Sequence, residues 1–240
     1  SYNTYAGEVQ SVRGVNFDVK HGEILAVIGE SGCGKSVTAR TIMSLIRHPG
    51  VVKEGSEIIF EGKNVLSMSK KELSQYRGGD CGMIFQGALV ALDPTMRVGK
   101  QIMENLRIHS KMSKKEAKEE AIRLLDVVGI PNAETRFKQY PFEFSGGMRQ
   151  RAMIAMAVAC QPKLVIADEP TTALDVTIQA QIMELLKRLR DEDGTSIILI
   201  THDFGVVAGF ADKIVVMYAG QIVERGSRQE IFYHPQHPYT

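Results

Sequence analysis

Short runs of hydrophobic residues predict the buried strands of this chain. Four runs rich in branched side chains have this pattern: Ile24–Ile28, Leu164–Ala167, Ser196–Thr201 and Lys213–Tyr218. Helical patterns separate several of them, and this alternation favours a largely parallel sheet in an α/β fold. After the last run, Ala219-Gly220 followed by Gln221–Glu224 predicts a hairpin, which adds an antiparallel region.

Amphipathic helices are predicted between and after these strands. Over Lys114–Val128, with Ser113 as the expected N-cap, one face is apolar through Ala117, Ala121, Leu124, Leu125 and Val128. Val176–Leu189 has the helical spacing through Ile178, Ile182, Leu185 and Leu189 and should end near Gly194. Ser227 and Glu230 predict a capping box for a short last helix.

The distribution of helical pattern indicates how the chain is organised. It dominates from Met103 to Ala159, and we interpret this part as an inserted helical subdomain. We expect a single domain over residues 1–240, in which residues 1–86 and 160–240 form the core and residues from about 87 to 159 form the subdomain. With 240 residues, of which 44% are hydrophobic, the chain can bury a sizeable core.

Composition excludes several classes of function. The 29 basic and 28 acidic residues give a net charge of +1, so no overall field favours nucleic acid as a partner. The three cysteines, Cys33, Cys81 and Cys160, are far apart, which indicates neither a disulfide framework nor a zinc site and suits a reducing cytosol. Hydrophobic runs stay well short of the roughly 18 residues that a membrane helix needs.

A glycine-rich segment directly after the first strand carries the clearest chemistry. Gly29–Ser36 reads Gly-Glu-Ser-Gly-Cys-Gly-Lys-Ser and fits the phosphate-loop pattern G-x-x-x-x-G-K-[ST]. Its backbone N–H groups can surround a phosphate, Lys35 can reach the β and γ oxygens, and Ser36 can ligate Mg²⁺. The preceding strand disfavours the alternative, a glycine-rich turn that matches by chance. The residues expected to contact the nucleotide here are Gly29, Glu30, Ser31, Gly32, Cys33, Gly34, Lys35, Ser36 and Val37.

Two carboxylates end the second apolar run. Asp168 and Glu169 follow Leu164–Ala167, an arrangement that suits one acid holding Mg²⁺ and a neighbour polarising a water molecule. We assign Asp168 to the metal site and Glu169 as the catalytic base. The alternative, two solvated acids at a strand end, is disfavoured because a phosphate loop precedes them.

Three later motifs, together with the phosphate loop, resemble those of ATP-binding cassette transporter subunits. In order, they are Phe144–Arg151 (FSGGMRQR), Asp168–Asp175 (DEPTTALD) and Thr201–Asp203 (THD). The resemblance covers essentially the whole chain. It implies a P-loop NTPase core with a mostly parallel sheet, an antiparallel β region and an inserted α-helical subdomain.

The resemblance also implies roles for single residues. Ser145, Gly146 and Gly147 would reach the γ-phosphate bound by a second subunit, although this segment could also be a plain helix N-terminus. Gln86 would touch Mg²⁺ or the attacking water, and His202 would contact the γ-phosphate. The implied catalytic residues are Glu169, His202, Gln86 and Lys35, and the implied metal ligands are Ser36, Gln86 and Asp168.

Two further residues have implied contacts with the nucleotide or its neighbour. Asp175 matches the loop that connects the two ATP sites, and it can equally cap the helix that begins near Val176. Tyr5 lies about where an aromatic ring stacks on adenine in the family.

Longer stretches are similar to the oligopeptide and dipeptide import branch of the family. They are Tyr140–Arg151, Thr172–Gln181 and His234–Thr240, whereas Gly87–Pro94 departs from that branch. The resemblance implies two subunits closing on two Mg·ATP at the cytoplasmic face of the cell membrane. Permease subunits, a second ATP-binding subunit that is identical or homologous, and indirectly an extracellular solute-binding protein are the expected partners.

Other functions compete with this interpretation. Nickel importers share much of the branch pattern, so nickel or another small solute is the alternative cargo. A soluble cassette protein without a permease is less favoured, since such proteins usually carry two cassettes or a long coiled-coil insertion and this chain has one cassette. A GTPase or small-molecule kinase is less favoured as well, since no Asn-Lys-x-Asp motif for guanine appears. The chain lacks the family's first edge strand and stops at Thr240, where relatives continue, so we expect it to be truncated at both ends.

Overall fold

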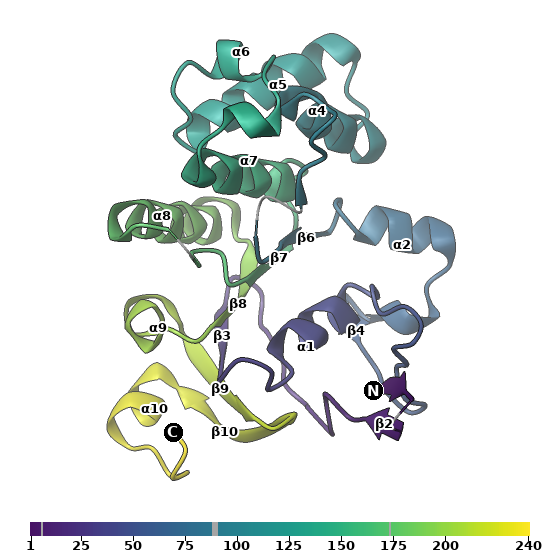
Figure 1. Ribbon diagram of the computed structural model, residues 1–240, viewed down its shortest axis with the longest axis vertical. Coiled ribbons are helices and arrows are strands. Elements are labelled where there is room, and N and C mark those ends of the chain that lie inside the picture. The colour runs from purple at the N-terminus through teal and green to yellow at the C-terminus, as the bar shows by residue number, and fades with distance from the viewer. Residues whose placement is uncertain (6, 88–90, 173) are drawn as a thin grey trace. The chain divides into compact units, whose positions relative to one another are not determined.

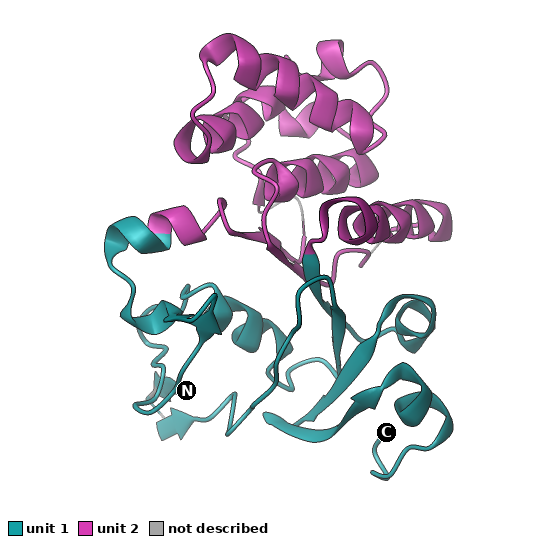
Figure 2. Ribbon diagram, turned by 180° about the vertical axis from the view of Figure 1, so that it is seen from behind, with its two compact units in different colours: residues 1–73, 196–240 teal, residues 74–195 magenta. Residues whose placement is uncertain are grey.

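The computed structural model describes residues 1–5, 7–87, 91–172 and 174–240. They form two compact units, unit 1 with residues 1–73 and 196–240 and unit 2 with residues 74–195 (Figure 2). Ala88–Val90, in the segment that departs from the branch pattern, lie outside the described residues. The same holds for Ala173 within the Asp168–Asp175 motif.

Unit 1 contains four strands that pair side by side. The strands β3 (Ile24–Ile28), β8 (Ser196–Thr201) and β9 (Lys213–Tyr218) are parallel, with β3 between the other two. The last strand, β10 (Gln221–Ser227), pairs antiparallel with β9 at the edge (Figure 1). Every residue of β3 and β8 is buried, as continuous apolar runs predict for parallel strands. The α/β fold with a mostly parallel sheet and an antiparallel region is therefore confirmed.

Smaller elements complete unit 1. Two hairpins pair β1 (Tyr2–Thr4) with β2 (Gly7–Val9) and β4 (Ile59–Phe60) with β5 (Lys63–Asn64). The helices are α1 (Lys35–Ile42), η1 (Val65–Ser67), α9 (Phe204–Phe210) and α10 (Arg228–Tyr233), and α2 (Lys70–Tyr76) crosses the boundary between the units. Side chains of α9 and α10 join those of β3 and β9 in one core cluster: Ala26, Ile28, Val207, Ala211, Ile214, Val216 and Ile231.

Unit 2 is mainly helical. A parallel pair, β6 (Cys81–Ile84) and β7 (Leu164–Asp168), is accompanied by α4 (Val98–His109), α5 (Lys114–Val127), α6 (Ala133–Arg136), η2 (Pro141–Glu143), α7 (Gly146–Val158) and α8 (Val176–Asp193). The helices α4, α5 and α7 pack on one another (Figure 1).

Local signals in the sequence set the helix ends. At α5, Ser113 Oγ accepts from the Glu116 N–H at 3.3 Å, and the Glu116 carboxylate accepts from the Ser113 N–H at 2.7 Å. Ser227 and Glu230 form the same capping box at α10. Gly194 ends α8 in the left-handed conformation, at φ 68°. The predicted helix starts and stops are confirmed at these positions.

Burial follows the predicted faces. The five apolar residues predicted for one face around α5, namely Ala117, Ala121, Leu124, Leu125 and Val128, are all buried. On α8, Ile182 and Leu185 are buried, whereas Ile178 and Leu189 are half-buried. The three cysteines are free thiols, and burial raises the pKa of Cys81 to about 12. Across the described ranges, no helix combines the length and apolar character that crossing a membrane requires.

Candidate functional site

The phosphate loop lies at the carboxyl end of the central strand of unit 1. Fully buried β3 ends at Ile28, the loop follows, and α1 begins at Lys35. Glu30, Ser31 and Gly32 are exposed, whereas Gly34 and Lys35 are buried. Ser36 and Val37 are half-buried in the first turn of α1. The predicted order of strand, loop and helix is therefore confirmed, and the outer part of the loop faces solvent.

The Lys35 side chain is folded back into its own loop. Lys35 is 4% exposed, and its Nζ donates to the Gly29 carbonyl at 2.6 Å and to the Glu30 carbonyl at 2.9 Å. Buried charges need polar partners, because losing water without replacement costs several kcal/mol. These two carbonyls accept two of the three N–H donors of the ammonium, and the remaining N–H can turn to a phosphate oxygen.

Two glycines make this closed loop possible. Gly34 has φ +105°, and a Cβ there would lie 2.4 Å from the Ser11 carbonyl oxygen. Gly29 has φ +155°, and a Cβ there would lie 2.2 Å from the Met217 carbonyl oxygen. Only glycine fits such close backbone approaches. Because these two residues have no side chain, the loop can lie directly against Ser11 and the β9 strand.

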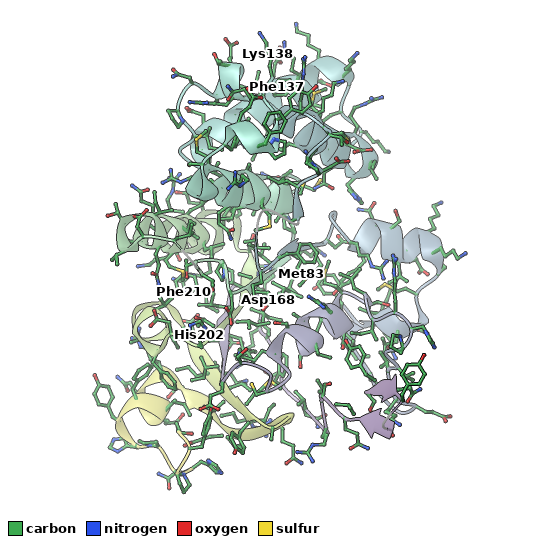
Figure 3. The ribbon with its side chains drawn as sticks, viewed as in Figure 1. Met83, Phe137, Lys138, Asp168, His202 and Phe210 are labelled. Carbon is green, nitrogen blue, oxygen red and sulfur yellow. The ribbon has the colours of Figure 1, made fainter. Side chains whose placement is uncertain are left out.

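His202 follows the strand next to the phosphate loop. In the β3–β8 ladder, Ile28 pairs with Thr201, so the segments that follow the two strands leave the sheet at the same end. His202, labelled in Figure 3, is exposed. The next residue, Asp203, caps α9 by accepting from the Gly205 N–H at 2.8 Å. Within unit 1, the topology therefore brings His202 and the phosphate loop to one edge of the sheet.

Tyr5 differs from the other predicted nucleotide contacts. It lies in the turn between β1 and β2, and its side chain is fully exposed, at 114% of the reference value. Its stacking on adenine therefore stays a prediction.

In unit 2, Gln86, Asp168 and Glu169 gather where two parallel strands end. Ile84 pairs with Ala167 in the β6–β7 ladder, so Gln86 and the two acids follow the same edge. Asp168, labelled in Figure 3, is the last residue of β7 and is 2% exposed. Topology alone therefore brings the predicted metal ligand, base and glutamine together.

Glu169 is held by two neighbours. Its Oε2 accepts from Gln86 Nε2 at 3.0 Å and from Thr172 Oγ1 at 2.8 Å. The residue has φ +49°, which is uncommon outside glycine and often marks functional positions. Sequence reasoning missed Thr172, although it lies inside the Asp168–Asp175 motif. The arrangement fixes a carboxylate at a strand end while leaving part of it accessible.

The loop after Glu169 is tied to α7. The buried Gln150 side chain donates from Nε2 to the Pro170 carbonyl at 2.6 Å. Gln150 belongs to the Phe144–Arg151 motif, and Pro170 to the Asp168–Asp175 motif. This bond joins two motifs that are separate in the sequence, and no pattern in the sequence identified it.

The Ser145–Gly147 segment forms the start of α7. Ser145 is the N-cap, with Oγ accepting from the Met148 N–H at 3.3 Å. Ser145 and Gly146 are exposed, and a Cβ on Gly146 would have no neighbour within 4 Å. The expected helix N-terminus is confirmed, with an open surface at its first residues. Its contact with a phosphate stays a prediction.

Asp175 starts the neighbouring helix. Its Oδ1 accepts from the Ile178 N–H at 2.9 Å, so the capping role is confirmed. A Cβ on Gly147 would lie 3.4 Å from Ile178 Cγ2, and Arg151 also hydrogen-bonds Gln181. The starts of α7 and α8 therefore lie side by side within unit 2.

Comparisons with known proteins match this arrangement. A family model described as ABC transporter matches residues 12–172. The oligopeptide transport ATP-binding protein OppD of Bacillus subtilis is 61% identical over 100% of this chain and 67% of its own length. The dipeptide transport ATP-binding protein DppD of the same organism is 55% identical over 100% of the chain and 72% of its own.

Solved structures of cassettes have the same fold. A dimeric, post-hydrolysis structure of the ATP-binding cassette MJ0796, bound to ADP and Pi, superposes with a TM-score of 0.81 at 28% identity. The match covers 91% of this chain and 90% of that one. Structural similarity thus extends well beyond the phosphate loop.

Gly34→Ala should weaken nucleotide binding by roughly tenfold or more, because its Cβ would force the loop away from Ser11. Calorimetric titration with ATP measures the affinity. Gly209→Ala in α9 is the matched control, since a Cβ there meets nothing within 4 Å. A folded Gly34→Ala protein with unchanged ATP affinity would show that the close approach of loop and Ser11 is irrelevant to binding.

Proposed function

The chain belongs to the ABC transporter family, and on that premise we propose that it is the ATP-binding and ATP-hydrolysing subunit that energises a peptide importer. The observation that carries this proposal is 61% identity over the whole chain with an oligopeptide transport ATP-binding protein. The local geometry also supports ATP binding and hydrolysis, because the phosphate loop is closed around Lys35 and the Glu169 carboxylate is held at a strand end.

ATP binds first through the phosphate loop. Backbone N–H groups at the start of α1 and the Lys35 ammonium hold the β and γ phosphates. The carbonyls of Gly29 and Glu30 hold the Lys35 ammonium in place, and its remaining N–H binds a charged phosphate oxygen, which is favourable because charge-assisted hydrogen bonds are stronger. Tyr5 is exposed and available to stack on the purine.

Hydrolysis transfers the γ-phosphoryl group to water. Glu169 accepts the proton of the attacking water as its oxygen bonds to phosphorus and the bond to the ADP oxygen breaks. Gln86 and Thr172 already orient the Glu169 carboxylate, and His202 helps to position the water at the γ-phosphate. Lys35 offsets the charge that develops on the phosphoryl oxygens.

The side chains expected to bind Mg²⁺ suit this ion. The Ser36 hydroxyl, the Gln86 amide oxygen and the Asp168 carboxylate are the oxygen ligands that this ion prefers. Among the residues that the structure describes, no group of three or more His, Cys, Asp or Glu side chains is placed to hold a metal by itself. The ion is therefore expected to share its coordination with ATP oxygens, where it would neutralise phosphate charge.

Two subunits are required for complete ATP sites. Ser145 and Gly146 are exposed at the start of α7, and free N–H groups at a helix start attract phosphate. We assign these groups, with Gly147, to the γ-phosphate of the opposing subunit. Asp175 starts the adjacent helix and connects the two sites. The similar MJ0796 cassette is dimeric in its ADP-bound structure, which supports this arrangement.

Motion of the dimer then drives transport. Closure on ATP and reopening after hydrolysis act on permease subunits, which receive solute from an extracellular binding protein. The subunit accordingly works at the cytoplasmic face of the membrane. We assign residues 1–86 and 160–240 to the nucleotide-binding core and about 87–159, including α4 to α7, to the helical subdomain.

Peptide is preferred over nickel as cargo because both similar relatives are named for peptide transport. In liposomes that hold the whole importer, an oligopeptide presented by the binding protein should raise the ATPase rate several-fold. Ni²⁺ presented in the same way should not. Stimulation by Ni²⁺ but not by peptides would assign the alternative cargo.

Glu169→Gln should lower the ATPase rate by about a hundredfold or more, since the base is lost while ATP binding is kept. Retained ATP should also hold two subunits together. Phosphate release and light scattering with and without Mg·ATP measure both effects.

Glu184→Gln is the matched control, because Glu184 is an exposed carboxylate on α8 outside the site. It should hydrolyse ATP at the unmodified rate. Normal turnover by Glu169→Gln would remove Glu169 from the catalytic role and with it the proposed mechanism.

A further inference from the structure

The segment His234–Thr240 folds back onto the phosphate loop. Across 209 positions of sequence, the Tyr239 hydroxyl accepts a hydrogen bond from the Glu30 N–H at 3.0 Å. None of the proposed steps of ATP hydrolysis uses this segment. Both partners belong to unit 1, and both lie near the strand end that carries the loop.

The Tyr239 bond reaches the peptide group that binds Lys35. The Gly29 carbonyl, which accepts from Lys35 Nζ at 2.6 Å, and the Glu30 N–H belong to one peptide unit. The Lys35 ammonium binds the oxygen of this peptide group, and the Tyr239 hydroxyl binds its N–H. Hydrogen bonds on opposite sides of an amide strengthen each other, and together they fix the orientation of its plane.

Tyr239 is itself well anchored. Its ring packs on Tyr218, with centroids 4.7 Å apart, and against the core cluster beneath α9 and α10. Its N–H donates to His237 Nδ1 at 3.2 Å. The hydroxyl is therefore a fixed acceptor.

Glu224 fastens the rest of the segment to β10. Its carboxylate accepts from the Gln236 N–H at 2.7 Å and the His237 N–H at 3.1 Å. The segment His234–Thr240 thus connects β10 to the phosphate loop, and we call this connection the brace.

We propose that Tyr239 is a positioning residue for ATP binding, because its hydroxyl holds the Gly29–Glu30 peptide in the orientation that presents Lys35 to the phosphates. This inference rests on the proposed ATP binding at the phosphate loop. Without the hydroxyl, the peptide gains freedom that ATP must remove on binding, so affinity falls. The chemical step at Glu169 is untouched.

Tyr239→Phe in the full-length protein tests this role. Titration with fluorescent ATP and steady-state hydrolysis should give a dissociation constant and a KM that are about three- to tenfold higher, the size expected for one hydrogen bond. The value of kcat should stay within about twofold. Tyr218→Phe is the matched control, since it removes a hydroxyl from the other ring of the same pair.

A second variant probes the brace at its other end. Glu224→Gln weakens the anchor of the segment, so it should raise KM in the same direction, and it should add little in combination with Tyr239→Phe. An unchanged KM in Tyr239→Phe, or an equal rise in Tyr218→Phe, would overturn the inference while leaving the proposed function intact. Absence of ATP binding in the unmodified protein would overturn both.

Discussion

A buried ammonium that must keep hydrogen-bond partners is the constraint on which the site depends. Lys35 is 4% exposed and is satisfied by two carbonyls of its own loop. Isolated in the interior, such a charge would cost several kcal/mol. The loop must therefore close around the side chain, and closure requires glycine where the backbone approaches Ser11 and Met217. The hydrogen-bond partners that the buried Lys35 ammonium needs therefore shape the loop that binds phosphate.

The catalytic half of the chemistry rests on the edges of parallel strands. The β3–β8 and β6–β7 ladders end in register, and their last residues are followed by the phosphate loop, His202, Gln86 and Glu169. Strand pairing thus determines which polar residues become neighbours within each unit. Side-chain bonds then refine the positions, as Gln86 and Thr172 do for Glu169. Buried strands give these residues a rigid base, which positioned catalytic groups require.

Local signals were predictable from sequence, and contacts between distant residues were not. The four main strands and the caps at Ser113 and Ser227 follow from hydrophobic runs and from residues three positions apart. The short β6 strand contains a glycine and has no such pattern. The bonds from Gln150 to Pro170 and from Glu30 to Tyr239 join segments whose proximity arises only from the fold. The ring of Tyr5 is fully exposed, and its predicted stacking on adenine rests on the family resemblance alone.

Calorimetric titration of the protein and its Lys35→Met variant with ATP shows whether the Lys35 ammonium binds the phosphates. Methionine fills the buried volume without the charge, so the fold should be kept. We expect ATP binding by the unmodified protein and affinity at least about tenfold lower in the variant, because hydrogen bonds to charged groups are lost. Equal affinity in two folded proteins would contradict the claim that the Lys35 ammonium, held in readiness by its own loop, captures the phosphates of ATP.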